Sequence, residues 1–321
     1  MYIHGEFINE VGDTIAVYIV TGADKTSEIE IGSDGSGIDF SSDPVKIESQ
    51  VNDTFDNLLQ YNATISFICD RIIPDFFQAS PRSAVVNIYR NSICIFAGFI
   101  KPQAYSQPFS EILDDLDIEC IDALSVLSYS KYKDIGTLGI SYSSVKSAAA
   151  QITFLDIFKL CLNNITSNID ILGNNTVSYW FDGSKAVSTY AENQYTIFSD
   201  LSISELLFLG DSEDDVWTQD TVISQILKYL NLHIVQEGFN FFIFSWSSVK
   251  NDKAIVWQEL GSSRTRTTVK DTVTISLDIS ADTDANVSIN DVYNQIELKC
   301  DVKSIENVIE SPLDRDRKSV V

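Results

Sequence analysis

Short stretches of the first 125 residues either alternate between apolar and polar positions or form β-rich apolar runs, and turn residues separate them. Alternation with a period of two is typical of strands that bury one face. We expect strands at 14–20, 28–31, 38–40, 63–69, 84–89, 92–100 and 116–121, and a hairpin turn at Arg90 and Asn91. Several short strands at this spacing predict a small barrel or sandwich.

The pattern becomes helical in the middle of the chain. Apolar residues recur at helical spacing over 152–163, and Thr153 is placed to cap that helix. A second helix is predicted over 218–231, with Thr218 as its N-cap and one apolar stripe along its length. A β-hairpin over 232–246 follows, because a glycine turn separates two β-rich runs.

Strand character returns near the end of the chain, where 273–279 and 294–300 alternate again. The sequence therefore predicts a mainly β (α+β) fold in three parts. Residues 1–127 form an N-terminal β domain, 128–271 form an inserted mixed α/β domain, and 272–321 begin a second β domain.

The charge balance excludes several classes of protein. The chain has 46 Asp+Glu against 22 Lys+Arg, a formal net charge of −24. Such an excess repels phosphate, so neither sequence-independent nucleic-acid binding nor binding to an anionic membrane is expected. A content of 44% hydrophobic residues is too high for a disordered acidic chain. The longest apolar run, 93–100, is far shorter than the ~20 residues that cross a bilayer, so we expect no membrane anchor.

The residues that usually carry catalysis are scarce or unpatterned. The five cysteines are odd in number and without C-x-x-C spacing, which predicts buried, reduced thiols in a protein made in the cytoplasm. His4 and His233, the two histidines, are expected to be structural. No hydrolase, phosphate-loop or metalloprotease motif occurs, and we predict no enzymatic activity, cofactor or metal. Two pairs of adjacent acids, Asp114–Asp115 and Asp214–Asp215, are expected by chance from the abundance of carboxylates.

The densest run of charge lies between Glu111 and Asp122, with six acids and no base. On a strand, Asp115, Asp117 and Glu119 point to one side and the apolar residues point to the other. Two interpretations remain open. The face is either an ordinary solvated surface or one wall of a ring whose lumen repels a passing polyanion. The first 125 residues hold 20 acids and six bases, a net of −14, which is over half of the excess.

A resemblance to a known family is carried by segments that span most of the chain. They are Tyr2–Phe7, Gly12–Thr14, Asp43–Val45, Val51–Asp56, Pro74–Phe77, Ala97–Ser106, the 218–246 helix and hairpin, and Asp291–Ile296. The first six resemble tail proteins of phages and prophages of the Bacteroides group. The last two resemble the baseplate or tail-hub family of long-tailed phages.

The resemblance implies a homotrimeric hub that caps the tail tube. Each subunit would carry two tube-like β-barrel domains with a mixed domain inserted between them, so that three subunits present six barrels to a hexameric tube. Asp115, Asp117 and Glu119 are then candidates for lining the DNA-ejection channel. The implied partners are the tail tube or distal tail protein, the tail tip or spike, and genomic DNA in transit without specific binding. The protein would be located in the virion, and the second barrel would not be complete at Val321.

Two other classes remain open. A tail-tip protein that binds a receptor or carbohydrate would use exposed aromatic residues such as Tyr179, Trp180 and Phe181, although large aromatics usually lie in cores. A cell-wall glycoside hydrolase would need two carboxylates about 5–9.5 Å apart in a groove. A hub would place Asp115 toward the inside of a ring, whereas a receptor-binding protein would show an outward aromatic groove.

Overall fold

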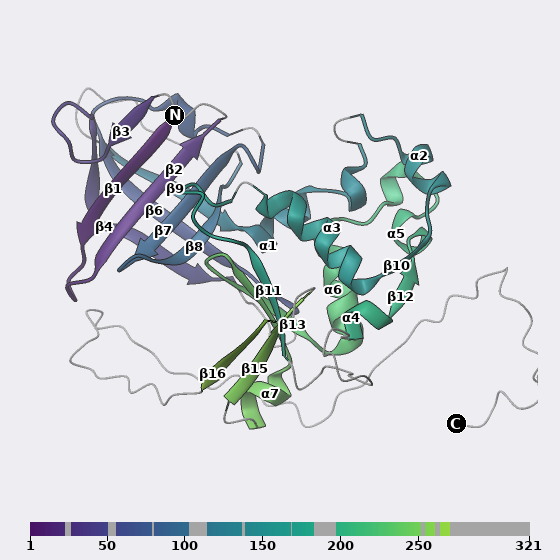
Figure 1. The fold of residues 1–321 in the computed structure, drawn as a ribbon. Helices are drawn as coiled ribbons and strands as arrows, with labels where there is room; N and C mark the ends of the chain where they lie inside the picture. The colour runs from purple at the N-terminus through teal and green to yellow at the C-terminus, as the bar shows by residue number, and fades with distance from the viewer. Residues whose placement is uncertain are drawn as a thin grey trace, which may run out of the picture. The chain divides into compact units, whose positions relative to one another are not determined.

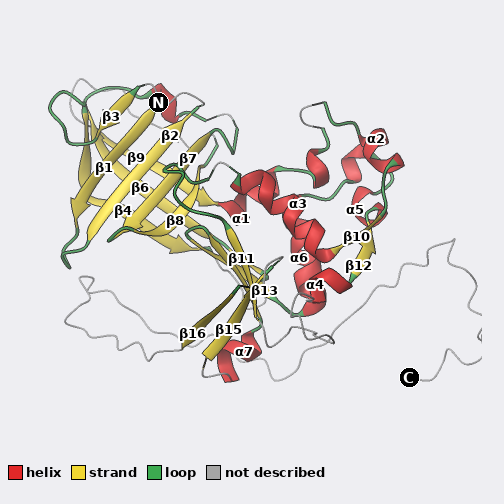
Figure 2. Cartoon of the chain, in the orientation of Figure 1, coloured by secondary structure: helices red, strands yellow, loops and turns green. Residues whose placement is uncertain are grey.

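The computed structural model describes residues 1–22, 27–50, 56–78, 80–102, 114–136, 139–167, 169–182, 197–251, 254–260 and 264–269. The chain divides into two units, Met1–Val273 and Thr274–Val321, and every described element lies in the first. That unit is mainly β (Figures 1 and 2). The strands predicted at 273–279 and 294–300, and with them the second barrel, lie outside the described residues.

The larger sheet has eight strands. Their order is β3 (Glu28–Glu30), β1 (Tyr2–Ile8), β2 (Thr14–Thr21), β7 (Ala84–Arg90), β8 (Ile93–Ile100), β9 (Asp114–Asp122), β6 (Tyr61–Cys69) and β4 (Ile38–Ser49). All neighbouring pairs are antiparallel except β1 and β3. The sheet is not a closed barrel, because in the described part of the chain its edge strands β3 and β4 do not pair with each other.

The seven strand stretches predicted in this region all fall on strands of the sheet. The β7–β8 turn lies one residue later than predicted. It is formed by Asn91 and Ser92, which have φ of 49° and 68°. Two consecutive left-handed residues give the turn the twist that a two-residue hairpin loop requires.

The concave face of this sheet encloses its own apolar core. Side chains from β1, β2, β7, β9, β6 and β4 meet there, including Ile3, Val17 and Phe67. The rings of Phe7 on β1 and Phe40 on β4 are 5.0 Å apart, so strands near opposite edges of the sheet pack on the same core.

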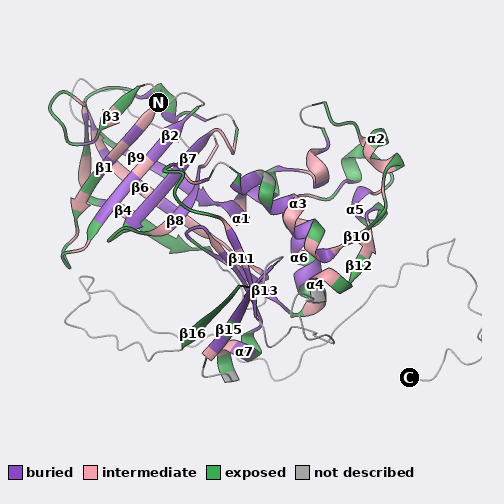
Figure 3. Cartoon of the chain, viewed as in Figure 1, coloured by how far each residue is buried: buried purple, intermediate pink, exposed green. Residues whose placement is uncertain are grey.

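The central strands are also buried on the opposite, outer face (Figure 3). On β2, Val17 and Ile19 enter the concave core, while Ala16 and Val20 pack into a second core with the helices. A strand that is covered on both faces reads as a continuous apolar run rather than an alternating one. This explains the sequences of β2 and β7, which have few polar residues.

A second, six-stranded sheet lies in the remainder of the unit. Its order is β16 (Thr265–Val269), β15 (Ala254–Glu259), β11 (Ser178–Asp182), β14 (Asn240–Phe244), β13 (His233–Glu237) and β5 (Leu58–Leu59). Strands β13 and β14 are the predicted hairpin. A two-stranded sheet joins β10 (Gln151–Thr153) to β12 (Ser202–Ser204).

The helices are α1 (Ala123–Val126), α2 (Tyr142–Ser147), α3 (Phe154–Thr166), α4 (Ile197–Asp200), α5 (Leu206–Leu209), α6 (Gln219–Leu230) and α7 (Trp246–Asn251), with 3₁₀ turns η1 (Pro74–Phe76), η2 (Leu127–Tyr129), η3 (Tyr132–Asp134) and η5 (Glu213–Asp215). Helices α1, α3, α4, α5 and α6 share one core with the outer face of the larger sheet, and we call them the helical layer. Helix α7 packs on the second sheet through Val249, and η1 contributes Phe76 to the concave core. Helices α3 and α6 confirm the two predicted helices. Among the residues described, no helix is both long and apolar enough to cross a membrane.

The caps of the two predicted helices differ. Thr153 accepts a hydrogen bond from the Asp156 N–H, as expected for an N-cap. Thr218 occupies the N-cap position of α6, but its hydroxyl makes no cap bond and instead lies 2.8 Å from the Thr221 hydroxyl. Asn231 ends α6 in the left-handed region, with φ of 53°.

Two buried amides join the larger sheet to the segments that cover it. Asn87 Nδ2 donates to the Ile169 carbonyl at 2.8 Å, and its Oδ1 accepts from the Ile171 N–H at 2.9 Å. Gln236 Nε2 donates to the Ala97 carbonyl at 2.7 Å. Leaving one of these buried groups unpaired would cost about 1–3 kcal/mol, so both amides fix how the layers fit.

The predicted burial of the cysteines is confirmed where the structure describes them. Cys69, Cys120 and Cys161 are buried and Cys94 is half-buried, and all four are free thiols. Cys300 lies outside the described residues.

We expect Gly238→Ala to destabilise the protein more than Gly12→Ala. Both glycines have positive φ, +55° and +88°, which costs an alanine about 1 kcal/mol. A Cβ on Gly238 would lie 2.5 Å from the Cys94 carbonyl oxygen, whereas nothing lies within 4 Å of one on Gly12. The excess loss should be about 1–3 kcal/mol in urea unfolding followed by circular dichroism. Equal losses would contradict the close packing of the hairpin on β8.

Candidate functional site

Strand β9 separates its acidic and apolar side chains as predicted. Asp115, Asp117 and Glu119 are exposed on the outer face of the sheet. The intervening residues are buried in the concave core and are Leu116, Ile118 and Cys120. The three candidate residues therefore lie on one surface. Whether that surface lines a channel stays a prediction.

The neighbouring strand β6 adds hydroxyl groups to this surface. Ser66 is paired with Asp117 and Thr64 with Glu119 in the antiparallel ladder. The Ser66 hydroxyl donates a 2.5 Å hydrogen bond to Asp117 Oδ1. Small polar side chains of this kind leave the carboxylates accessible to solvent.

The fold also brings further charges of both signs to the surface. Asp39 on β4 is in register with Ile68, which pairs with Asp115, and Glu48 lies farther along the same strand. Lys101 Nζ lies 2.6 Å from a Glu119 oxygen, and Lys46 Nζ lies 2.9 Å from Glu48. Exposed ion pairs contribute only about 0–1 kcal/mol. The lysines reduce the negative charge of the surface without reversing it.

We call the five carboxylates of this surface the acidic face: Asp39, Glu48, Asp115, Asp117 and Glu119. Beside it, the apolar side chains on the outer side of β2, β7 and β8 are buried in the core that they share with the helical layer. The boundary runs across β9 itself, since Ile121 points to the same side as Glu119 yet is 4% exposed. One strand thus passes from an open acidic surface to a covered apolar one.

The acidic face offers fixed negative charge and hydrogen-bond acceptors, and these determine which molecules it attracts or repels. It repels polyanions at short range and attracts cations weakly. Within the described ranges, no three His, Cys, Asp or Glu residues are grouped so that they could hold a metal ion.

Both histidines have structural surroundings, in agreement with the prediction. His4 Nε2 lies 2.9 Å from Glu28 Oε1, and its ring stacks on Tyr2 at 5.0 Å. His233 is buried, and its Nδ1 lies 2.8 Å from the Asp56 carbonyl oxygen. Burial lowers the pKa of His233, which disfavours its charged form.

The aromatic residues proposed for receptor binding do not form an outward groove. On β11, Phe181 is fully buried and Trp180 is 7% exposed, while Tyr179 is half-buried. Trp180 Nε1 donates to Asn240 Oδ1 at 3.0 Å. These side chains belong to the packing of the second sheet, as large aromatics commonly do.

The adjacent acids at η5 also have a structural explanation. Asp215 accepts hydrogen bonds from the Ser212 N–H and hydroxyl at 3.1 and 2.8 Å, which forms a capping box. Asp214 is fully exposed. Of the other adjacent pair, Asp114 and Asp115, only the Asp115 side chain belongs to the described residues, and it is exposed.

Sequence reasoning did not separate Asp122 from the acidic run, although its environment is different. Asp122 is 2% exposed and is the N-cap of α1. Its carboxylate accepts from the Tyr61 N–H at 2.9 Å and from the Ser125 N–H and hydroxyl at 2.8 and 2.6 Å. Burial raises the pKa of Asp122 to about 6. Asp122 follows the buried Cys120 by two residues, so the alternation of β9 places it on the buried side of the strand. That alternation is the sequence signal that could have identified it.

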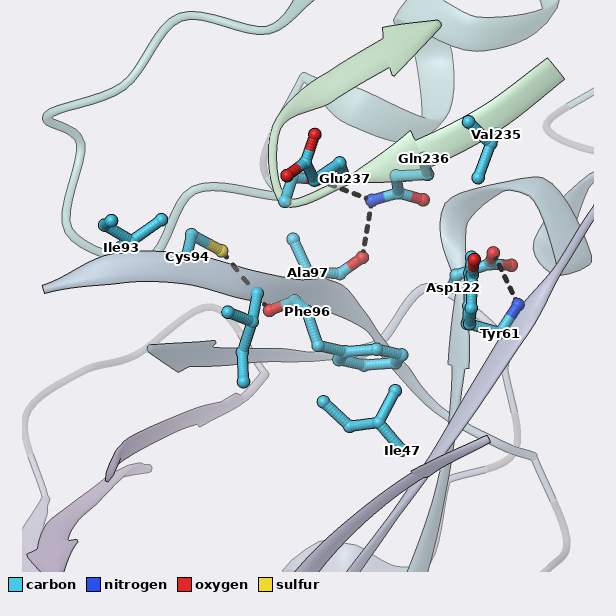
Figure 4. Close-up of a pocket in the computed structure, with 12 residues that line it drawn as sticks. Ile47, Tyr61, Ile93, Cys94, Phe96, Ala97, Asp122, Val235, Gln236 and Glu237 are labelled. Atoms are coloured by element: carbon cyan, nitrogen blue, oxygen red, sulfur yellow. Dashed lines mark hydrogen bonds between the residues drawn. The ribbon is translucent and has the colours of Figure 1, made fainter. Parts of the chain in front are cut away.

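Asp122 lies at one end of a groove of about 460 Å³ (Figure 4). The groove is lined by Ile47, Tyr61, Ile93, Cys94, Ile95, Phe96, Ala97, Asp122, Val235, Gln236, Glu237 and Gly238. These residues come from β4, β6, β8, β9 and the β13–β14 hairpin. Sequence analysis did not predict the groove, because no local pattern links segments so far apart.

Comparison with known proteins gives weak structural similarities, among them two prophage tail proteins. No protein-family model and no curated protein matches the chain. A 43 kDa tail protein of prophage MuSo2 from Shewanella oneidensis overlaps 63% of this chain and 55% of its own at 7% identity and a TM-score of 0.34. The prophage tail protein gp18 from Listeria monocytogenes overlaps 68% of this chain and 52% of its own at 10% identity and a TM-score of 0.31. The chain spans about half the length of each.

We expect folding stability to fall as the pH rises from about 4 to about 6, because of Asp122. Its folded pKa of about 6 exceeds the ordinary value of 3.8, so the folded state holds the proton more tightly than the unfolded state. This contribution to the free energy of unfolding is fully present below the unfolded pKa. It is lost as the pH rises through the folded pKa, and the total loss is roughly 3 kcal/mol.

Urea unfolding at pH 4 and pH 7 measures this loss in the native protein and in Asp122→Asn, which should show a smaller pH dependence. Asp34→Asn removes an exposed charge and serves as the matched control. An unchanged pH dependence in Asp122→Asn would show that other groups cause it.

Proposed function

We propose that the chain is a structural, non-enzymatic protein of a phage tail whose acidic face borders a passage for DNA. The observation that carries this proposal is the division of the sheet's outer face. The covered part binds the helical layer of the same chain, while β9, β6 and β4 leave the carboxylates uncovered. The sequence segments that resemble phage tail proteins support the same assignment.

A surface beside moving DNA needs to repel it at short range without binding it. Duplex DNA carries about one negative charge per 1.7 Å of its axis. The field of exposed carboxylates is screened over about 8–10 Å at physiological salt, so repulsion acts only in a narrow passage. A ring of subunits would repeat the acidic face on every side, and the DNA would then find no favourable contact on the wall.

The finer form of the proposal is a homotrimeric hub that caps the tail tube. In it, each chain would contribute two tube-like β domains, contact the tube or distal tail protein on one side, and contact the tip or spike on the other. Among the described residues, β3 and β4 are the edge strands of the larger sheet, and edge strands can form sheets with neighbouring chains, which supports assembly into a ring. The virion would then be the location of the protein and DNA ejection the process it serves.

We expect the purified protein to form a trimer, with a mass about three times the chain mass of 35.8 kDa. Size-exclusion chromatography with light scattering over a range of concentrations measures this mass. Negative-stain images of the trimer should show a ring. A monomer at every concentration, both alone and mixed with a tail-tube protein, would contradict the hub.

We also expect that reversing the charge of the acidic face creates a DNA-binding surface. The variant Asp115→Lys, Asp117→Lys, Glu119→Lys should retain duplex DNA at low salt and release it as salt rises, because clustered lysines displace counterions. Binding is measured by fluorescence anisotropy of labelled DNA.

The control carries the same change in net charge at exposed turns far apart in the sequence, namely Glu10→Lys, Asp34→Lys and Asp211→Lys. It should not bind DNA, because its lysines do not form one surface. Equal binding by both variants would mean that net charge, and not the acidic face, governs contact with DNA.

A further inference from the structure

The loop that follows β6 holds an exposed phenylalanine on a buried base. Phe76 in η1 is fully buried, and its ring stacks on that of Phe67 at 6.0 Å. The backbone closes the turn, since the Phe77 N–H donates to the Pro74 carbonyl at 3.0 Å. Phe77 itself is 57% exposed, and Ile72 on the same loop is 48% exposed. The loop therefore presents apolar side chains to solvent from a fixed position.

Phe77 differs from the other exposed aromatic residues because its side chain has no polar atom. Among the described residues, those others are Tyr129, Trp217, Tyr229 and Trp246. A Tyr or Trp side chain has an apolar body and a polar group, which suits a surface in contact with water. A phenyl ring lacks such a group, and aromatic rings are enriched where proteins bind one another. Phe77 is thus the exposed aromatic residue that gains most from being covered.

The groove of Figure 4 offers an apolar surface of suitable size. Its lining includes the side chains of Ile47, Ile93, Ile95 and Val235. Ile93 is 70% exposed and Ile47 is 36% exposed, so part of this lining is open to solvent. The volume of about 460 Å³ lies in the usual range of ligand pockets, which is large enough to admit an aromatic side chain.

The buried polar side chains of the groove are already engaged within the chain. The Asp122 carboxylate accepts from the Tyr61 N–H and from the Ser125 N–H and hydroxyl. Gln236 donates to the Ala97 carbonyl, and its side-chain oxygen accepts from a backbone N–H of α1. An apolar group can therefore enter the groove without leaving these donors and acceptors unpaired. A guest that needs hydrogen bonds would find few of them there.

Phe77 and the groove lie toward opposite ends of strand β6. Tyr61 begins this strand and lines the groove, whereas Cys69 ends it and leads into the loop that carries Phe77. Nine residues of strand span about 30 Å. The phenyl ring therefore cannot enter the groove of its own chain, but it can enter the groove of a second copy.

We propose that Phe77 of one copy of the chain inserts into the groove of the next copy. The inference rests on the proposed function, because it names the contact that would build the homotrimeric ring. Two different patches meet in this contact, so it is heterologous and closes into a ring when the rotation between neighbours permits. Burial of the phenyl ring and of the open aliphatic side chains supplies the driving force.

The charges around the two patches predict how this contact responds to salt. Arg71 beside the loop and Glu237 at the groove are exposed and opposite in sign, but Asp70 and Asp75 are also exposed near Phe77. Each copy also carries a formal net charge of −24. Apolar burial must therefore outweigh a net repulsion, and added salt should strengthen the contact by screening that repulsion.

The first test measures the mass of the full chain and its variants by size-exclusion chromatography with light scattering. Phe77→Ser and Ile93→Ser should each weaken self-association by about tenfold or more, because each truncates a large apolar side chain in the contact. An equimolar mixture of the two variants should regain one contact, between the intact Phe77 of one and the intact groove of the other. The mixture should form a species of twice the chain mass of 35.8 kDa. Mixing would not rescue a folding defect.

Two matched controls make the same kind of change elsewhere on the surface. Tyr229→Ser removes an aromatic ring that is 78% exposed, and Val11→Ser removes an aliphatic side chain that is 66% exposed. Both variants should associate like the native chain. Equal weakening by the controls would mean that general surface hydrophobicity, and not this contact, drives association.

Photocrosslinking then locates the contact. Phe77→p-benzoylphenylalanine keeps an aromatic ring at the site and bonds to nearby C–H groups on irradiation. We expect linked pairs of chains, and mass spectrometry should place the link on Ile93–Ala97 or on Val235. The same replacement at Tyr229 should give no link to the groove.

The possible failures are distinguishable. A trimer that Phe77→Ser leaves unchanged, or links that fall outside the groove, would overturn this contact and leave the hub intact. Links only to an added tail-tube protein would identify a different occupant and overturn the second copy. A chain that stays monomeric would overturn both the contact and the trimer. The DNA-binding test of the acidic face is separate, because Asp115, Asp117 and Glu119 take no part in this contact.

Discussion

The burial of β2, β7 and β8 on both faces is the constraint on which the rest of the described structure depends. One face contacts the concave core, and the other face packs against the helical layer. These strands have almost no position where a charged side chain would reach solvent. The buried amides of Asn87 and Gln236 form hydrogen bonds that join the layers. The helices must cover the outer face of these strands, because its apolar area is too large to be exposed to water.

The distribution of charge follows from that constraint. In the larger sheet, the exposed acidic side chains lie outside the area that the helical layer covers, and β9 crosses the boundary within its own length. Its outward positions change from Glu119 to Ile121 where the cover begins. Asp122 then turns inward, ends the strand and caps α1. In the described part of the chain, β9 pairs with β8 only at Gly98–Ile100. The acidic face, the buried carboxylate and the groove therefore all involve the same strand near its end.

Local pattern predicted those elements whose signal lies in consecutive residues. Seven strands of the larger sheet, helices α3 and α6 and the β13–β14 hairpin were predicted from periodicity and turn chemistry, as was the common orientation of Asp115, Asp117 and Glu119. Strand β1 was not predicted. Features made by distant segments were not. Lys101 reaches Glu119 from outside the acidic run, and β11 pairs in parallel with β14 from a stretch rich in turn residues. The groove combines five such segments, so no window of sequence contains its signal.

The two-residue strand β5 has a consequence for how the chain folds. Leu58 and Leu59 pair with β13, and the Asn57 side chain donates to the Leu232 carbonyl 175 residues away. Contacts between such distant residues are slow to form, because a long loop must close first. At a synthesis rate of roughly 5–20 residues per second, β5 leaves the ribosome about 10–35 s before its partner. The second sheet therefore cannot be completed during synthesis of the N-terminal half. It can form only after β13 has been synthesised.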